Sequence, residues 1–579
     1  MRGRLRGAVA VAAAALLLVG CTGVPANSTP QVIGQVGVSA SDTASTAPPA
    51  GADPRQIVVD FLDASSTSDP AHAKARQYLT PDAKAHWNDK TVTVVDQFRV
   101  SNLVNGAVTL TARKIGSIDA TGTYTPELQG DGSGDLLAVP FTFGMQLVSG
   151  EWRIQTLPNS VFVTSENFQP LYNHYALYFY DLAQQHLVPD LRYSPLTDAG
   201  LLADWLIQQL VAGPRPALAD SVTSELPQVT DPLKVSVQVG APSVITLPGA
   251  SQLDPQTRNR VAAQLAFTLT QVTLVQSMQI VDALRPVAIP AADGPAFSAT
   301  TFQSAMSVQS ATSALYYIHN GAVVDEAGRP LPGALGSSGG GGSGLSSVAL
   351  AANGSTNLRI AGVSGTGATQ RLSIGTLVEG IQPTAVRGAL SRPAWAPGRD
   401  EVWVGAGPSV IRVGADRKPL PVSITARSGS VTGSVSAIRF SPEGSRVALV
   451  LSFPGGTGQV WVGSIVRSQS QVRIDGLEQV TPNGIVTRDV AWNDPLKLWV
   501  VGRNLASGDV NVYEVQIDGA LLTPRGTTNL PGGDPDSITV AEGQVPWVSA
   551  GQSVWFLPGA AWASPGNGET FGTNPIYVE

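Results

Sequence analysis

The sequence predicts an exported multidomain protein in which two α+β domains are followed by an all-β propeller of five or six blades. The chain begins with basic residues and an apolar run that ends at a cysteine, which is typical of exported proteins. Helical patterns followed by strand patterns occur twice before about residue 290, and a Gly-, Ser-, Val- and Trp-rich region with recurring phrases follows. At 579 residues the chain exceeds what one hydrophobic core organises, so several domains are expected.

The N-terminus has the pattern of a cleavable signal peptide. Arg2, Arg4 and Arg6 precede an uncharged apolar run over residues 8–19, which ends in the phrase LVGC. This run is long enough for a secretory signal but shorter than the ~20 residues that span a bilayer as a helix. The sequence therefore predicts a signal peptide over residues 1–20, with Cys21 as the mature N-terminus.

Cys21 is the candidate lipidation site. It is the only cysteine, so neither an internal disulfide nor a thiolate metal cluster can form. We expect an N-palmitoyl, S-diacylglycerol cysteine, because each buried CH₂ contributes roughly 0.8 kcal/mol and two or three acyl chains anchor stably. An uncleaved membrane anchor with an incidental cysteine is the alternative. The expected location is the extracytoplasmic face of the cell membrane, where the lipid anchor holds the protein.

Composition limits the partners of the mature chain. Without Arg2, Arg4 and Arg6, the 36 basic side chains fall to 33, against 43 acidic ones. An acidic chain with no basic block argues against nucleic acid as a partner and against electrostatic adhesion to anionic lipid. Residues 22–52 are mostly Thr, Ser, Pro, Ala and Gly, so residues 21–52 are expected to form a disordered, lipid-anchored tether.

The first α+β domain is expected over residues 53–166. A helix begins at Pro54, a second helical stretch covers about 71–78, and strands with alternating apolar residues follow. The helical face contains Ile57, Val58, Phe61 and Leu62, and the alternating strand residues are Val108, Leu110, Ala112, Phe141, Phe143, Met145 and Leu147. A turn at Ser149-Gly150 leads into the phrase GEWRI. This order of elements is similar to that of nuclear-transport-factor (NTF2-like) domains.

A second α+β domain is expected over residues 170–288. The phrase YALYFYD predicts a strand that is buried on both faces, and a helix containing Leu201 to Leu210 ends at Gly213-Pro214. Pro255 begins another helix, and residues 278–281 form a strand. The phrases LVPDLR, LLADWLIQQLVAGP and ELP, in this order, resemble a GerMN domain. That resemblance implies a binding or assembly role without enzymatic activity.

A β-propeller is expected over residues 310–579. The phrases RPAWAPGRDEVWV, AIRFSPEGSRVALV and DVAWNDPLKLWVV recur, with 45 residues from Trp395 to Phe440 and 52 from Phe440 to Trp492. This spacing suits a four-stranded blade. The phrase ALYYIHNGAVV either pairs with the last strand to close the ring or forms a linker. One or two long β-sandwiches are the alternative fold.

No residues are predicted to be catalytic or to bind a metal or cofactor. The five histidines never have the helical spacing of a zinc protease. A serine-nucleophile pattern at residues 336–340 lies in a glycine-rich loop, and His86 is expected to be partly buried. Five tryptophans are candidates for stacking on carbohydrate, but four of the five lie in apolar strand phrases, so packing between blades is the favoured interpretation. Four acidic residues are interpreted as solvated turn carboxylates. These residues are Trp395, Trp461, Trp492, Trp499 and Trp547, and Asp400, Glu401, Asp534 and Asp536.

Over its whole length the chain resembles the LpqB lipoproteins of actinobacteria. The resemblance implies a non-enzymatic accessory role beside the MtrA–MtrB two-component system. The partners would be the extracytoplasmic domain of the sensor kinase and the plasma membrane, and the effects would fall on envelope homeostasis and division. The alternative is an envelope-binding module that recognises peptidoglycan, glycan or a secreted peptide through the propeller. The phrase FSPEGSRVALV also resembles prolyl-peptidase propellers, which makes a hydrolase the third hypothesis.

Overall fold

The computed structural model describes most of the chain after residue 47. Not described are residues 1–47, 68–69, 129–136, 293, 307–311, 333–334, 336–343, 354–356, 427–432, 469–470, 527–529 and 567–569. The predicted signal peptide, Cys21, most of the tether and the serine pattern at 336–340 lie outside the described residues. Within the described part, no helix combines the length and the apolar character that crossing a bilayer requires.

The first α+β region begins with α2 (Pro54–Ser65), as predicted. Asp53 caps the helix by accepting a hydrogen bond from the Gln56 backbone N–H, and Ile57, Val58 and Phe61 are buried. The stretch predicted as a second helix consists instead of two 3₁₀ turns, Pro70–His72 and Ala75–Tyr78. A left-handed backbone at Ala71 interrupts this stretch, which explains why no continuous helix forms. The short helix α3 (Pro81–His86) follows.

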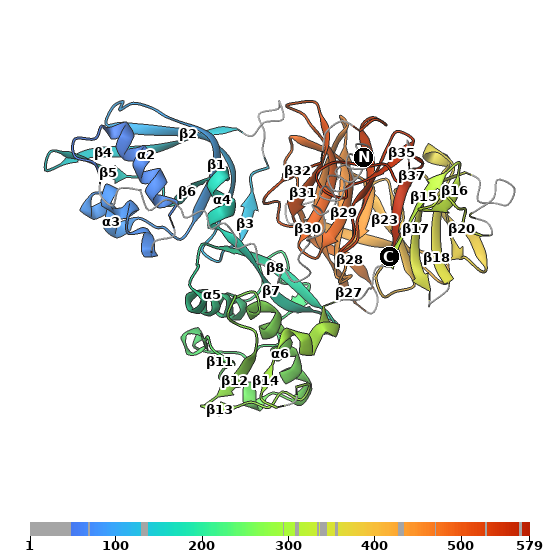
Figure 1. The fold of residues 1–579 in the computed structure, drawn as a ribbon, viewed down its shortest axis with the longest axis horizontal. Coiled ribbons are helices and arrows are strands. Elements are labelled where there is room, and N and C mark those ends of the chain that lie inside the picture. Colours follow the sequence, from blue (N-terminus) through green and yellow to red (C-terminus); the bar gives the residue numbers. More distant parts are fainter. Residues whose placement is uncertain are drawn as a thin grey trace, which may run out of the picture. The chain divides into compact units, whose positions relative to one another are not determined.

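A mixed sheet covers these helices, with strand order β5-β4-β2-β1-β6 and β3 added to β2 (Figure 1). The alternation predicted for Val108, Leu110 and Ala112 is confirmed, since all three are buried. Leu147 is 53% exposed, so the predicted alternation is wrong at the end of β4, where the hairpin turns at Ser149 and Gly150. The strands are β1 (Val92–Val100), β2 (Ala107–Ile118), β3 (Tyr124–Pro126), β4 (Ala138–Val148), β5 (Glu151–Thr156) and β6 (Val161–Thr164).

The second α+β region contains two small sheets, of order β8-β7-β9 and β10-β11-β12-β13, with β14 paired to β12. Helix α5 ends at Gly213, whose φ of 99° favours glycine, and α6 begins at Pro255 as predicted. Leu201, one of the apolar residues of the predicted helix, is 59% exposed, whereas the adjacent Leu202 is buried. The elements are α4 (Ser165–Leu171), β7 (Asn173–Asp181), β8 (Leu187–Ser194), α5 (Ala199–Ala212), β9 (Val222–Thr223), β10 (Ser236–Gln238), β11 (Ser243–Thr246), α6 (Pro255–Leu269), β12 (Met278–Asp282), β13 (Arg285–Pro286) and β14 (Ala296–Phe297).

The C-terminal region is a propeller of six blade sheets, two of which are joined into one continuous sheet. Three sheets have four strands each, and an eight-stranded sheet consists of two further four-stranded units joined through β24 and β28. The innermost strands of these units are β17 (Leu345–Asn353), β21 (Ala394–Trp395), β25 (Ser434–Phe440), β29 (Ile485–Asp494) and β33 (Pro535–Thr539). The outer strands are β18 (Asn357–Ser364), β19 (Arg371–Thr376), β20 (Gly380–Arg387), β22 (Glu401–Ala406), β23 (Ser409–Gly414), β24 (Pro419–Ala426), β26 (Arg446–Phe453), β27 (Thr457–Arg467), β28 (Val472–Gln479), β30 (Lys497–Asn504), β31 (Val510–Gln516), β32 (Thr523–Arg525), β34 (Trp547–Ala550), β35 (Ser553–Phe556) and β36 (Thr570–Phe571).

The sixth sheet closes the ring. It joins β15 (Thr312–His319) and β16 (Ala322–Asp325) to β37 (Thr573–Val578), the last strand of the chain, in the order β16-β15-β37. The antiparallel register pairs Leu315 with Tyr577 and Tyr316 with Ile576. The phrase ALYYIHNGAVV therefore pairs with the last strand, and six is the correct one of the two predicted blade numbers. This closure pairs the last strand of the chain with the first strand of the propeller, so the two ends of the repeat region are joined in one blade.

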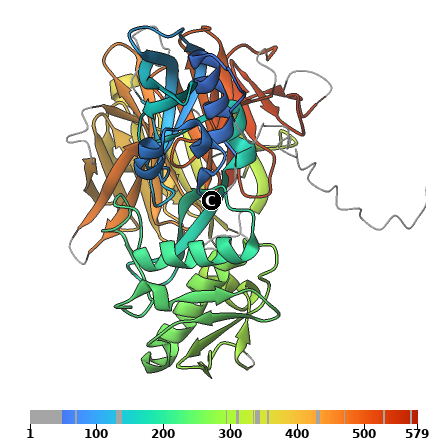
Figure 2. The ribbon, with the colours of Figure 1, turned by 90° about the vertical axis from the view of Figure 1, so that its left-hand side faces the viewer.

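Strand β8 of the second region belongs to the compact unit that extends from Ser45 to Glu579, whose ribbon Figure 2 shows from a second direction. All eight of its residues are buried. The backbone N–H of Tyr193 donates to Gly122 of the first region, and its hydroxyl donates to Asp518 of the propeller, at 3.3 Å. Arg446 of β26 donates to the carbonyl of Pro189. Strand β8 therefore contacts both the first region and the propeller through hydrogen bonds.

Charged groups accompany this junction. Asp190 on β8 forms an ion pair with Arg192 at 2.8 Å and with Arg215 at 3.4 Å. Arg215 also lies 3.4 Å from Glu478 of β28 in the propeller. Burial raises the pKa of Asp518 to about 6, while Ala520, Arg215 and Tyr193 act in the opposite direction. The junction therefore contains a carboxyl group that titrates under mildly acidic conditions.

Replacing Asp518 by Asn is expected to remove a pH dependence of the stability. The folded-state pKa of Asp518 lies above that of an unfolded Asp, so ionisation of the unfolded chain is favoured as pH rises from about 4 to about 6. The free energy of unfolding of the wild type should therefore fall over this interval relative to D518N. Urea unfolding at several pH values measures the difference. D220N, which changes an exposed carboxylate of the second region, is the control and should follow the wild type.

Candidate binding cavity of the propeller

A cavity of about 290 Å³ lies among the innermost strands of the propeller. Five of the six sheets contribute to its lining, through residues at or near the ends of β21, β25, β29, β33 and β37. Cavities of this size lie at the small end of the range for ligand pockets. The side chains that the following argument uses are Arg392, Trp395, Arg439, Trp492, Tyr577 and Glu579.

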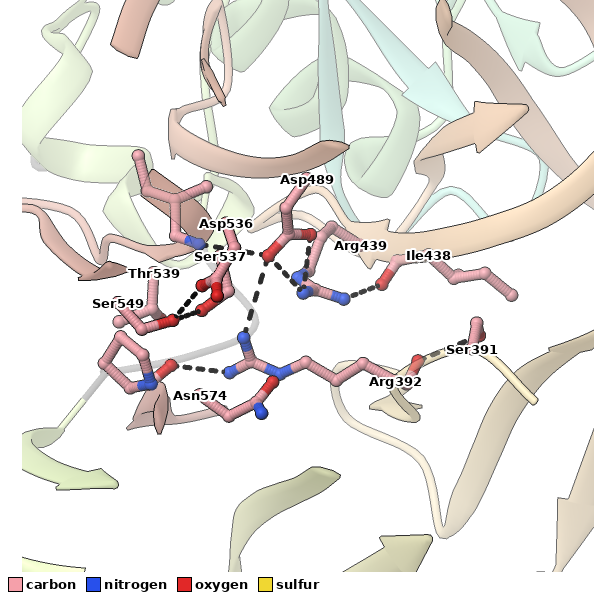
Figure 3. A network of polar contacts seen from close by, with 12 residues as sticks. Ser391, Arg392, Ile438, Arg439, Asp489, Asp536, Ser537, Thr539, Ser549 and Asn574 are labelled. Atoms are coloured by element: carbon pink, nitrogen blue, oxygen red, sulfur yellow. Dashed lines mark hydrogen bonds and ion pairs between the residues drawn. The ribbon is translucent and has the colours of Figure 1, made fainter. Parts of the chain in front are cut away.

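Asp489 organises the polar network beside this cavity (Figure 3). Arg439 donates through Nη2 to both carboxylate oxygens of Asp489, at 2.9 and 3.2 Å, and through Nη1 to the Ile438 carbonyl at 2.7 Å. The backbone N–H of Ile538 donates to Asp489 Oδ2 at 3.0 Å. Asp489 thus connects β29 to β25 and β33, and its hydrogen bonds satisfy a buried charge.

Arg392 is the second guanidinium near Asp489. Its Nη2 donates to the carbonyl of Pro575 at 2.7 Å, but its Nη1 lies 3.9 Å from Asp489 Oδ2 and has no hydrogen-bond partner among the described residues. Burial and the neighbouring Arg439 lower the pKa of Arg392 to about 9, against Asp489 and Glu579, which raise it. Arg392 is thus a buried arginine of the cavity lining whose Nη1 faces Asp489 without reaching hydrogen-bonding distance.

Glu579 and two tryptophans complete the wall. Glu579 Oε2 accepts a hydrogen bond of 2.7 Å from the backbone N–H of Trp395, and burial raises the pKa of Glu579. The Trp492 indole donates to the Arg439 carbonyl at 3.0 Å, and the Trp395 indole donates to Ala349 at 3.3 Å. Because these hydrogen bonds fix the indole rings, the cavity has a preformed aromatic wall.

The tryptophans predicted to pack between blades are largely where expected. Trp395, Trp492, Trp499 and Trp547 are each at most 7% exposed, whereas Trp461 is half-buried. Trp395 and Trp492 combine packing with a place in the cavity wall, which the sequence prediction did not include.

The prediction for Glu401 is wrong. Glu401 begins β22, is 8% exposed, and accepts hydrogen bonds from Trp403, Arg412 and Arg467. Its pKa is lowered because these donors outweigh the effect of burial. The other predicted turn carboxylates, Asp400, Asp534 and Asp536, are exposed. The prediction for His86 is also wrong, since its side chain is 77% exposed while the adjacent Trp87 is buried.

Sequence reasoning missed Arg392, Arg439 and Asp489 as functional candidates. A usable signal was present, because each is the one charged residue in the four-residue start of a recurring blade phrase, namely RPAW, AIRF and DVAW. Arg392 and Asp489 each precede a cavity-lining tryptophan by three residues. A charged residue in an innermost strand is buried at the centre of the ring, so it needs a partner there. Within the described part of the chain, no group of three or more His, Cys, Asp or Glu side chains is placed to hold a metal ion.

Comparisons with known proteins define the class first: this is a lipoprotein with a C-terminal β-propeller. Family models match residues 47–169 (Lipoprotein LpqB, N-terminal domain), 176–281 (Sporulation and spore germination) and 321–577 (Lipoprotein LpqB beta-propeller domain). The chain belongs to the Lipoprotein LpqB family, in agreement with the resemblance seen in the sequence. The domain boundaries predicted above remain predictions.

Two relatives illustrate the extent of the match. Lipoprotein LpqB of Mycolicibacterium smegmatis is 31% identical over 78% of this chain and 78% of its own length. The Rhodococcus opacus protein is 28% identical over 90% of this chain and 88% of its own length. Among solved structures, TolB from Acinetobacter baumannii is 13% identical, covers 54% of this chain and 84% of its own, and has a TM-score of 0.31.

Replacing Asp489 by Asn is expected to destabilise the propeller by about 3–5 kcal/mol, because the buried Arg439 loses its carboxylate partner. D534N is a matched control: Asp534 also accepts hydrogen bonds from two arginines, Arg488 and Arg503, but is half exposed. Its loss should cost less than about 1 kcal/mol. Tryptophan fluorescence during urea unfolding reports on the propeller, which contains eight of the eleven tryptophans. Equal destabilisation by the two variants would contradict the importance of Asp489.

Proposed function

We propose that this protein is a membrane-anchored, extracytoplasmic and non-enzymatic accessory protein of a sensor kinase, of the MtrA–MtrB type, that affects envelope homeostasis and cell division. Membership of the LpqB lipoprotein family over most of the chain supports this proposal. The signal peptide at residues 1–20 and lipidation of Cys21 would place the folded part at the outer surface of the plasma membrane.

The observation that carries the proposal is the buried strand β8. Tyr193 bonds to both the first region and the propeller, and Arg215 connects Asp190 to Glu478. A partner that contacts one region is therefore linked to the other two regions through these hydrogen bonds and ion pairs. Since a tether confines the protein to the membrane surface, its effective concentration near another membrane protein rises to about the millimolar range, and weak contacts suffice.

A second candidate function is favoured by the propeller cavity. Its fixed aromatic wall and the buried Arg392 in its lining are features of a ligand site. In this reading the propeller recognises an envelope-derived molecule. The two functions are compatible, because a kinase partner would contact a surface of the protein while the cavity holds the ligand.

Replacing Cys21 by Ala is expected to release the protein from the membrane and to abolish kinase capture. Proximity crosslinking in intact cells, followed by mass spectrometry, should recover a sensor kinase with the wild type but not with C21A. S28A, a change in the same tether that leaves the cysteine intact, is the control and should behave as the wild type.

Two results would count against the kinase role. Equal recovery of the kinase with C21A and with the wild type would show that anchoring is not required. Recovery of wall glycan or its synthases alone, with no kinase, would favour the second candidate. Cell fractionation of the same strains reports anchoring separately, since C21A should leave the membrane fraction whichever partner is captured.

A further inference from the structure

The two most exposed large apolar side chains of the described residues lie at one end of one small sheet. Leu233 precedes β10 and is 87% exposed, and Leu284 follows β12 and is 95% exposed. Ser236 of β10 pairs with Thr246 of β11, which pairs with Val281 of β12, so both leucines lie beyond the same row of the sheet. Strands β10 and β12 flank β11 and are therefore roughly 10 Å apart.

The folded state gives no reason for a leucine at position 284. Asp282 pairs with Arg285, so Ala283 and Leu284 form the two-residue turn between β12 and β13. Their φ angles of 47° and 65° lie in the left-handed region, where Asn and Gly are favoured and leucine is uncommon. This side chain is neither buried nor suited to its turn, so a contact outside the chain is the remaining physical reason for it.

An exposed basic residue follows each leucine, Lys234 in one connection and Arg285 in the other. Lys234 lies 4.0 Å from Asp231 in an exposed pair, and Asp282 also lies at this end of the sheet. The charge is therefore locally balanced, although the chain as a whole is acidic. A long basic side chain beside an apolar one can reach lipid phosphate groups while the apolar side chain enters the acyl region.

The shape of this end of the sheet favours a bilayer over a protein as the partner. A stable protein interface buries about 800 Å² on each side and is closely packed. Two protruding side chains roughly 10 Å apart form no such surface, whereas the fluid headgroup region of a bilayer accepts single apolar groups. A bilayer is also within reach of the anchored protein, because residues 21–48 can span at most about 100 Å.

We propose that the second α+β region inserts Leu233 and Leu284 into the boundary between headgroups and acyl chains of the membrane that holds the anchor, with Lys234 and Arg285 at the level of the lipid phosphates. This inference rests on the anchoring at Cys21 in the proposed function and adds a second contact with the same membrane. Two leucines bind weakly on their own, but the tether raises the effective concentration of the bilayer, so weak insertion suffices.

Site-specific fluorescence in proteoliposomes tests the proposal. The lipidated full chain with Leu284→Cys is reconstituted in phosphatidylcholine vesicles and labelled with an environment-sensitive dye. Cys21 is the only native cysteine and acylation blocks its thiol, so the new thiol alone reacts. We expect emission at shorter wavelength, and quenching by lipids that carry a nitroxide on the acyl chain. Because Leu284 is exposed in the folded protein, this replacement leaves the core unchanged.

Val378→Cys is the matched control. Val378 is a 79% exposed aliphatic residue in the turn between β19 and β20, but it is followed by Glu379 instead of a basic residue. A dye at this position should show neither the shift nor the quenching. With the dye on Leu233→Cys, the additional change L284N should lower the ratio of inserted to free label about 10-fold, because the apolar side chain of Leu284 is lost. Asn suits the left-handed turn, so L284N should not lower the free energy of unfolding.

Several outcomes would overturn the proposal. Absence of quenching at position 284 in vesicles that carry the anchored protein would exclude insertion, and equal quenching at position 378 would show unspecific adsorption. A shift that grows with the number of protein copies per vesicle, without quenching, would identify contact between copies. Protection of position 284 only in cells that contain the kinase would identify a protein partner. Flotation of the vesicles reports anchoring separately: protein that does not float would contradict lipidation of Cys21 and this inference together, whereas floating protein without quenching contradicts this inference alone.

Discussion

The propeller depends on the shared carboxylate of Asp489. From β29 it accepts hydrogen bonds from Arg439 on β25 and from the backbone of Ile538 on β33, and Arg392, which precedes β21, lies 3.9 Å away. Four neighbouring blades thus approach one carboxylate near the axis of the ring. A buried ion pair is weak evidence for net stability, because desolvation opposes the attraction between the charges. The ion pair instead favours one arrangement of the innermost strands, because displacing one of them leaves a charge buried without a partner.

The same physical argument applies to β8, although there the groups belong to different regions. Asp190 and Arg192 lie on a strand with no exposed residue, and Arg215 and Tyr193 extend their contacts to the propeller through Glu478 and Asp518. An apolar junction of the same size would tolerate sliding, whereas directed hydrogen bonds have one good geometry. Polar contacts at the axis and at β8 therefore determine how the parts of the described chain fit together.

The spacing of apolar residues predicts helices and strands that bury one face, because it records which residues are buried. It does not predict contacts between residues that are far apart in the sequence. Helix α2 and strand β2 were found from apolar spacing, and the structure confirms them. Whether the phrase ALYYIHNGAVV closes the ring was left open by the sequence and is decided by its pairing with the last strand. The alternation failed at Leu147, where β4 extends past the core. Glu401 was misread because its donors Arg412 and Arg467 are brought to it only by the fold. The cavity was missed for the same reason, since Arg392, Asp489 and Glu579 are far apart in sequence.

The network around Asp489 contains one imbalance. Two guanidiniums approach Asp489, but its oxygens make hydrogen bonds with Arg439 and Ile538, while Arg392 Nη1 remains 3.9 Å away. A buried donor without a hydrogen bond costs about 1–3 kcal/mol. Moving Arg392 closer to Asp489 would place it in competition with Arg439 and would break its hydrogen bond to Pro575. The contacts already made by Arg439 and Pro575 therefore explain why the gap between Arg392 and Asp489 stays open.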